Sequence, residues 1–146
     1  MIKHLKLTEH FSLKELCVTN VKNVNNAPPA VVINNLVEIA ETLEKLRFAL
    51  GGEPIVINSG YRSKEVNKAV GGSPTSYHLQ GCAVDIKCCN LDDACRKMAT
   101  LARLCPDFDE LYIEGDIGSE SVWLHYANDP WSPGKRKVGV IRKILR

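Results

Sequence analysis

The sequence predicts a single α+β domain built on an antiparallel sheet whose helices pack on one side. Three observations support this fold class. A long helical pattern covers residues 29–49, two short apolar runs cover 54–60 and 82–88, and two strand-like runs near the C-terminus cover 109–114 and 121–127. The 146 residues are enough to bury a core without disulfides, so we treat residues 1–146 as one domain.

The first half of the chain is predicted to contain an arm and the longest helix. Residues 1–27 are predicted to form a short strand or an extended arm and then a short helix, which Ser12 caps by accepting a backbone N–H two or three residues further on. Over 29–49, apolar side chains recur at steps of three and four residues while charged side chains occupy the other faces. Gly51 and Gly52 then stop the helix.

Two more helices are predicted in the middle of the chain, and each has a capping residue. Ser63 caps a short helix that covers 64–70, and Asn90 caps a longer one that covers Leu91–Leu104. The two runs near the C-terminus are separated by the polar stretch GDIGSE, which predicts an antiparallel hairpin. Residues 138–145 either close the sheet as a last strand or form a terminal helix.

Composition and charge exclude some classes of function. The formal net charge of +2 is too small to indicate a nucleic-acid partner. No run is long and apolar enough to cross a membrane, so we expect no stable membrane insertion. As a separate expectation, we predict that the protein is a monomer. The opening MIKHLKLTEHF contains too many charged and polar residues for a secretory signal. We therefore expect synthesis in the cytoplasm without a signal peptide.

The segment 135–146 is markedly basic. It is either a solvated final strand or a surface that favours an anionic cell wall or phospholipid leaflet. Its basic residues are Lys135, Arg136, Lys137, Arg142, Lys143 and Arg146.

The even number of cysteines, six, would allow a disulfide framework. The absence of a secretory signal speaks against it, and the adjacent Cys88 and Cys89 would make a strained bridge with each other. We interpret most of the cysteines as small buried apolar residues in a reducing compartment. A second metal site made of Cys88, Cys89 and Cys95 is the alternative.

A candidate metal site lies in the glycine-rich stretch from Ser59 to Ile86. His78 and Asp85 are seven residues apart, a spacing that lets a loop residue and a strand residue converge on one ion. Strand alternation directs Asp85 away from the bulky apolar face. His125, among apolar and aromatic residues, is the best candidate for a third ligand. Two histidines, one carboxylate and an open fourth position describe a catalytic zinc site.

The motifs around these residues resemble those of a known family. The pattern SxHxxGxAxD, formed by Ser76 to Asp85, is followed some forty residues later by WLH, and SGYRS and HFSLKEL match two further segments. This set resembles the zinc D-Ala-D-Ala carboxypeptidase family, which shares its fold with the hedgehog signalling domain and includes phage endolysins and vancomycin-resistance dipeptidases. The resemblance implies a hedgehog/DD-peptidase-like fold, one Zn²⁺ ion bound by His78, Asp85 and His125, and a peptidoglycan stem peptide as substrate.

The position of the catalytic base departs from the family pattern. Relatives often carry a carboxylate three residues before the second histidine, where this chain has Val122. The base must then be Glu114, Glu120 or Asp116, and we favour Glu114 because it ends the strand predicted to pair with the His125 strand. The alternative is that all three are solvated hairpin carboxylates without a catalytic role.

Other residues are expected to bind the substrate. By resemblance, Arg62 holds a substrate carbonyl or carboxylate and steadies the oxyanion, although a structural pairing with Glu65 or Asp85 is the alternative. Ser76 either donates to the substrate or orients Asp85. Tyr61 is expected to line the cleft together with Tyr77 and Trp123, although each of these aromatic residues could equally belong to the core.

The leading hypothesis is a zinc peptidase that cleaves peptidoglycan, either a D-Ala-D-Ala carboxypeptidase-like enzyme or an endolysin-type endopeptidase. The lack of a signal favours a phage or prophage endolysin, which reaches the cell wall when a holin or lysis releases it. The rival is a zinc-binding or cell-wall-binding module on the same fold without catalysis. A third reading, a structural zinc with Cys82 as fourth ligand, also stays open.

Overall fold

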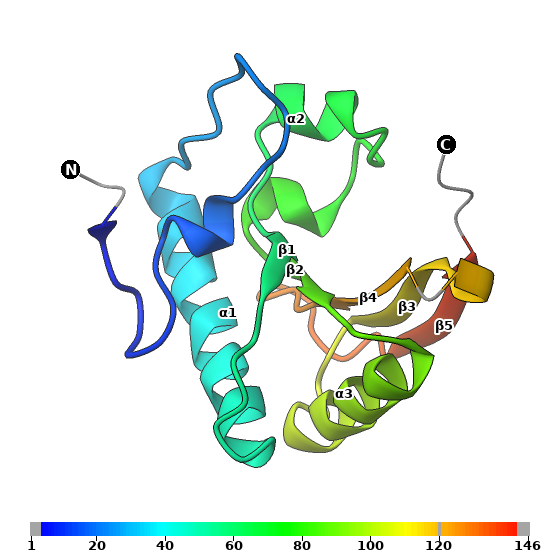
Figure 1. Cartoon of the computed structure of the whole chain (residues 1–146). Helices are drawn as coiled ribbons and strands as arrows, with labels where there is room; N and C mark the ends of the chain where they lie inside the picture. The colour runs from blue at the N-terminus through cyan, green and yellow to red at the C-terminus, as the bar shows by residue number, and fades with distance from the viewer. Residues whose placement is uncertain (1–3, 120, 143–146) are drawn as a thin grey trace.

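The computed structural model describes residues 4–119 and 121–142. Its centre is a five-stranded sheet with the strand order β1-β2-β4-β3-β5 (Figure 1). Neighbouring strands are antiparallel except β3 and β5, which are parallel. The predicted single α+β domain is confirmed, with a sheet that is mostly antiparallel. The strands are β1 Ile57–Ser59, β2 Ala83–Lys87, β3 Glu110–Asp116, β4 Ser121–Ala127 and β5 Lys137–Arg142.

Three α-helices accompany the sheet: α1 Ala30–Ala49, α2 Lys64–Ala69 and α3 Leu91–Leu104. The predicted caps of α2 and α3 are confirmed. The Ser63 hydroxyl accepts the N–H of Val66 at 3.2 Å, and the Asn90 side chain accepts the N–H of Asp93 at 2.9 Å. Short 3₁₀ helices are η2 Glu15–Cys17, η3 Tyr77–Gln80 and η4 Ile117–Ser119. Ser12 accepts the N–H of Glu15 at 3.3 Å, just before η2.

The hydrophobic core lies on one face of the sheet, between the strands and the helices α1 and α3. In Figure 1, α3 lies below the strands and α2 above them, so the short helix α2 sits towards the opposite face. The prediction that the helices pack on one side therefore holds for α1 and α3 but not for α2. Alternation decides which side chains reach the core. The core-facing residues of the three central strands are almost fully buried: Val84, Ile86, Leu111, Ile113, Val122, Leu124 and Tyr126.

The second face of the sheet carries polar side chains. Asp85 on β2 and Tyr112 on β3 are both Cα partners of His125 on β4, which lies between them. Side chains two residues along a strand share a face, so Glu110 and Glu114 lie on the same side as Tyr112. The sheet therefore gathers one histidine and three carboxylates on the face opposite the core.

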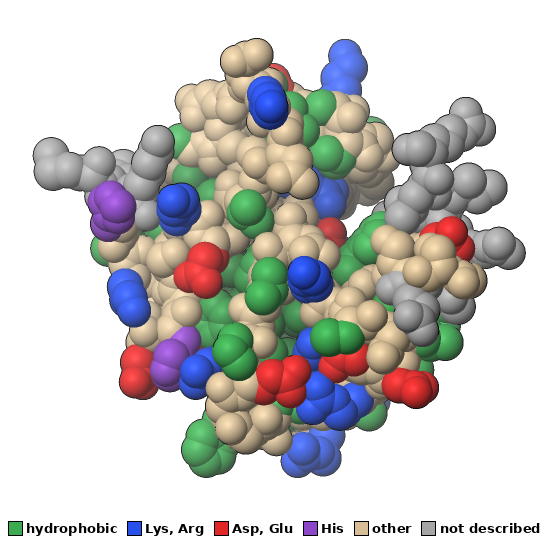
Figure 2. Space-filling view, viewed as in Figure 1, with side chains coloured by type: hydrophobic (Ala, Val, Ile, Leu, Met, Phe, Trp, Pro, Cys, Tyr) green, Lys and Arg blue, Asp and Glu red, His purple; other side chains and the backbone are tan. Residues whose placement is uncertain are grey.

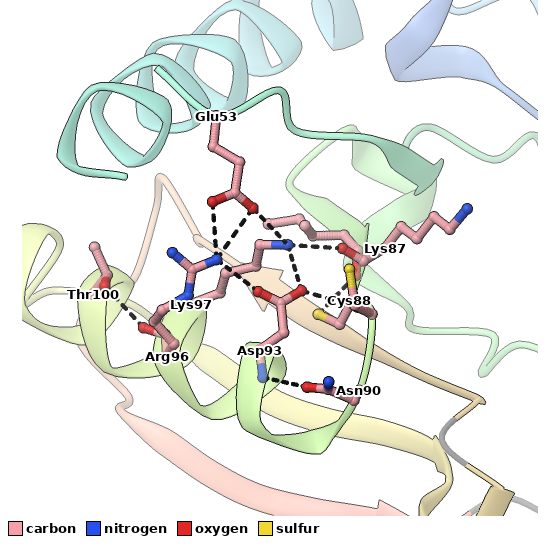
Figure 3. Close-up of polar contacts among 10 residues, drawn as sticks. Glu53, Lys87, Cys88, Asn90, Asp93, Arg96, Lys97 and Thr100 are labelled. Atoms are coloured by element: carbon pink, nitrogen blue, oxygen red, sulfur yellow. Dashed lines mark hydrogen bonds and ion pairs between the residues drawn. The ribbon is translucent and has the colours of Figure 1, made fainter. Parts of the chain in front are cut away.

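An ion-pair network anchors α3 to the loop after α1 and to the end of β2 (Figure 3). Lys97, only 4% exposed, donates to Asp93 Oδ2 at 2.8 Å and to the carbonyl of Lys87 at 3.2 Å. Arg96 bonds Asp93 and also Glu53, which precedes β1. Two cations of α3 thus tie this helix to the loop after α1 and to the end of β2, and Asp93 binds both cations.

Residues 137–142 form a strand, β5. Of the two alternatives predicted for the last segment, a closing strand or a terminal helix, the strand is therefore found up to Arg142. Lys143 and Arg146 of the predicted basic cluster lie outside the described residues. On the face drawn in Figure 2, acidic and basic side chains are interspersed. Among the described residues, no helix has the length and apolar character needed to cross a membrane.

All six cysteines are free thiols. The prediction that most of them are buried is wrong, because only Cys82 and Cys88 are buried, whereas Cys17 and Cys105 are partly exposed. Burial raises the pKa of Cys82 to about 12 and of Cys88 to about 11. Cys89 and Cys95 are exposed. Within the described residues, Cys88, Cys89 and Cys95 do not form a group of converging metal donors.

Candidate metal centre

Three structural elements supply the predicted ligands. His78 belongs to η3, where the Ser76 hydroxyl accepts its backbone N–H at 3.2 Å. The chain then turns at Gly81, whose φ of +70° suits glycine and where a Cβ would lie 2.7 Å from a methyl carbon of Val32. This turn leads into β2 and places Asp85 beside His125 of β4.

The three side chains converge in the structure. His125 Nδ1 lies 3.0 Å from Asp85 Oδ1, and His78 Nε2 lies 3.3 Å from the same oxygen. One donor atom from each residue fits within 4.8 Å of the others, and all three residues are buried. Within the described residues, this is the one group of its kind.

The donor set fits a zinc ion. Zinc binds histidine nitrogen and carboxylate oxygen at about 2.0–2.2 Å, and a tetrahedral arrangement then separates neighbouring donors by about 3.3 Å. The two donor separations in the structure, 3.0 and 3.3 Å, are close to that value. Two imidazoles and one carboxylate also leave a fourth position free for a small ligand.

Each histidine has a hydrogen-bond partner on its other ring nitrogen. The carbonyl of Gly60 accepts from His78 Nδ1 at 2.7 Å, which leaves Nε2 facing the cluster. The carboxylate of Glu110 lies 2.9 Å from His125 Nε2, which leaves Nδ1 facing the cluster. Such outer partners fix the ring orientation and tautomer of metal-binding histidines.

The charges in the cluster depend on one another. Burial alone would raise the pKa of Asp85, but the adjacent His78 and His125 hold it far below its usual value. Burial alone would lower the pKa of His125, but hydrogen bonds to Asp85 and Glu110 outweigh it and raise that pKa to about 9. Asp85 is therefore an anion ready to bind a cation.

Arg62 is engaged with the same aspartate. Its Nη2 donates to Asp85 Oδ2 at 3.2 Å, its Nε to the Ser59 hydroxyl at 3.0 Å and its Nη1 to Asn67 at 3.3 Å. The structural pairing with Asp85, one of the two alternatives for Arg62, is thus present. Binding of substrate by Arg62 stays a prediction.

A cleft of about 480 Å³ opens over the cluster. Glu114 and Ser76 line it together with the three predicted ligands, and Glu114, although only 6% exposed, is close enough for its charge to help raise the pKa of His125. A larger hollow of about 840 Å³ beside Phe48 contains none of the ligands. We place the candidate site in the smaller cleft because the metal donors converge there.

Some predicted site residues lie elsewhere. Tyr61 is 8% exposed, packs in the hydrophobic core and does not line the cleft, whereas Tyr77 does. A role for Tyr61 in binding substrate stays a prediction. Among the alternative bases, Asp116 does not line the cleft and Glu120 lies outside the described residues. Val122 faces the core and is 5% exposed.

Two residues of the site, Glu110 and Tyr112, were not predicted from the sequence. Both line the cleft, and the ring of Tyr112 stacks on that of His125 with centroids 5.7 Å apart. Alternation back from Glu114 along one strand would have placed both on the site face. Lys137 and Ile141 of β5 also line the cleft, and they were missed because the last segment was not assigned to a strand or a helix.

The fold and the site together define a class of protein: an α+β domain with a buried donor set of the kind that hydrolytic zinc proteins use. A model of the peptidase M15 family matches residues 9–125. The chain therefore belongs to the peptidase M15 family.

The sequence of one curated relative matches about half of this chain. It is the zinc D-Ala-D-Ala carboxypeptidase of Streptomyces albus G, to which this chain is 33% identical over 85 residues. The match covers 52% of this chain and 33% of the relative, so the chain spans about a third of the length of the curated relative it matches.

Proposed function

We propose that the chain is a zinc peptidase that hydrolyses a peptide bond in the stem peptides of bacterial peptidoglycan. The observation that carries the proposal is the buried group of His78, Asp85 and His125 at the base of a cleft that also contains Glu114. Membership of the peptidase M15 family and the similarity to a protein named zinc D-Ala-D-Ala carboxypeptidase support this choice of reaction and substrate.

His78, Asp85 and His125 would hold the ion. When bound there, zinc supplies a Lewis acid that polarises a carbonyl and makes water nucleophilic near neutral pH. Glu114 takes the proton from the attacking water and delivers it to the leaving amine. Its position on the site face of β3, in the same cleft as the ligands, supports this role.

Arg62 has two roles in the proposal. It holds Asp85 in place through the 3.2 Å ion pair, and it presents a positive charge at the wall of the cleft. A guanidinium there can donate to a substrate carbonyl or carboxylate as negative charge develops. Ser76 lies at the same wall, where its hydroxyl is already engaged by the N–H of His78.

The test is incubation of the zinc-loaded protein with purified muropeptides, followed by mass spectrometry. A chelator-treated sample and the Glu114→Gln variant are the controls. We expect products only with zinc and the native glutamate. Loss of a single terminal alanine would identify a carboxypeptidase, whereas cleavage inside the stem or the cross-link would identify an endopeptidase.

Intact muropeptides in every sample, with zinc bound at one ion per chain, would contradict the proposal and favour the non-catalytic binding module. An endolysin role, with release to the cell wall through a holin or lysis, is part of the proposal. Fractionation of the producing cells tests it, and native protein in the periplasm before lysis would count against it.

A further inference from the structure

We propose that Glu110 is a positioning residue that selects which ring nitrogen of His125 binds the metal. The inference rests on the metal centre of the proposed function and adds a residue to it. Glu110 was not among the candidates from sequence.

The contact between Glu110 and His125 decides the tautomer. Glu110 Oε1 lies 2.9 Å from His125 Nε2, on the side of the ring away from Asp85. A carboxylate accepts hydrogen bonds, so Nε2 must carry a proton. Nδ1 also faces a carboxylate, so the metal-free ring carries a proton on each nitrogen. A metal ion bound at the cluster would take the place of the Nδ1 proton, while Glu110 would keep the proton on Nε2. Nδ1 is the nitrogen that lies 3.0 Å from Asp85 Oδ1.

The surroundings restrict both partners. Tyr112, two residues after Glu110 on β3, stacks on the His125 ring at an interplanar angle of 11°. Burial and then the nearby Glu110 carboxylate raise the pKa of the Tyr112 hydroxyl, so the two side chains are close neighbours. One strand thus holds the imidazole ring by its face and by its outer nitrogen. With the ring held in this way, Nδ1 is directed at the cluster by contacts within the protein and does not need a metal ion to orient it.

The two histidines reach the same arrangement by different means. The outer nitrogen of His78 is held by a backbone carbonyl, that of Gly60 at 2.7 Å, which no side-chain substitution removes. The outer nitrogen of His125 depends on a side chain. The tautomer of His125 is therefore the one that mutation can disturb, and the two glutamates of β3 have separate tasks: Glu110 orients a ligand, and Glu114 moves a proton.

The experiment measures zinc affinity by competition with a chromophoric chelator, without any substrate. Outer partners of metal ligands are typically worth about 10- to 100-fold in affinity, so we expect a loss of that order for Glu110→Ala. Glu110→Gln should lose less, because its amide oxygen can still accept from Nε2. The matched control is Glu114→Gln, which removes the same charge from the same strand and cleft but leaves the contact between Glu110 and His125 Nε2 in place, so we expect a smaller loss of zinc affinity than for Glu110→Ala.

Thermal unfolding of the metal-free variants separates positioning from general damage. If Glu110→Ala does not fold, the comparison of Glu110→Gln with Glu114→Gln carries the test. Equal zinc affinity in Glu110→Ala and wild type would overturn the inference, as would an equal loss in Glu114→Gln. Wild-type protein that does not bind zinc would overturn the metal centre itself, so the two failures are distinguishable.

Discussion

Replacing Asp93 with asparagine should destabilise the fold through the buried Lys97. The ammonium group of Lys97 lies 2.8 Å from Asp93 Oδ2, and the side chains of Lys97 and Asp93 are 5% and 10% exposed (Figure 3). Asparagine keeps the shape and an oxygen that can accept the N–H of Cys89, as Asp93 does at 2.9 Å. The substitution therefore removes the negative charge and the acceptor that Oδ1 offers to the exposed Arg96.

The size of the loss follows from what Lys97 retains. Removing one partner of a buried ion pair typically costs about 3–5 kcal/mol. Here Lys97 keeps the carbonyl of Lys87 at 3.2 Å and the carboxylate of Glu53 at 4.0 Å, and the asparagine oxygen still accepts. We therefore expect a loss of about 2–3 kcal/mol. In a domain of this size that corresponds to a fall in Tm of roughly 6–9 °C.

The assay is urea unfolding and thermal unfolding of Asp93→Asn beside two matched variants. Arg96→Ala removes the other cation that binds Asp93, but its side chain is 47% exposed, so we expect little change in stability. Lys97→Met combined with Asp93→Asn should be more stable than Asp93→Asn alone, because no unpaired charge is left buried. The reasoning is refuted if Asp93→Asn and Arg96→Ala unfold at the same urea concentration.

Three further predictions concern the site and the pH dependence of stability. His78→Ala should lose zinc binding, so an excess of zinc at about 100 times the wild-type Kd should stabilise wild type by about 2.7 kcal/mol and leave the variant unchanged, as thermal unfolding with and without zinc will show. Glu114→Gln should keep one zinc per chain by metal analysis while turnover falls by about 10²- to 10⁴-fold, and full activity would move the base elsewhere. Burial alone would raise the pKa of Asp93, but hydrogen bonds from Lys97 and Arg96 outweigh it and hold the pKa below its usual value. Because the folded pKa is lowered, this carboxylate stabilises the fold above about pH 4 and loses that effect as the pH falls further. The difference in stability between wild type and Asp93→Asn should therefore shrink from about pH 5 to pH 2, and a constant difference would contradict the assignment.

The sequence was most informative where structure is local. The helix predicted over Leu91–Leu104 has those bounds, because Asn90 caps it and its hydrophobic period is regular. The helix predicted over 29–49 begins one residue later, at Ala30. The alternation that directs Asp85 away from the core is also a local property of one strand.

Non-local pairing was harder to predict. The last segment forms β5 because it pairs in parallel with β3, and no pattern within the segment reveals a partner more than twenty residues away. β1 is only three residues long, Ile57–Ser59, because the chain leaves the sheet at Gly60 to pack on the backbone of Leu16, where a Cβ would lie 2.2 Å from the carbonyl oxygen.

The candidate site, like the fold, could be predicted from the sequence only in part. The ligand residues could be proposed from residue type and spacing, but their convergence depends on the register that pairs Asp85 with His125. Alternation back from Glu114 would have placed Glu110 on the site face, but its contact with the outer nitrogen of a ring on another strand could not be predicted. The pairing of Arg62 with Asp85 was one of two alternatives for the role of Arg62. The sequence could not decide between them, because the pairing depends on the conformation of the loop that brings the two side chains together.

The most direct test of this account is zinc-edge X-ray absorption of the purified protein, combined with the metal content of the His78→Ala variant. We predict one zinc per chain with two imidazole nitrogens, one carboxylate oxygen and one small non-protein ligand, all at about 2.0–2.2 Å. Sulfur at about 2.3 Å would reveal a cysteine ligand and a closed structural site. That result, or zinc retained in full by His78→Ala, would contradict the catalytic metal centre.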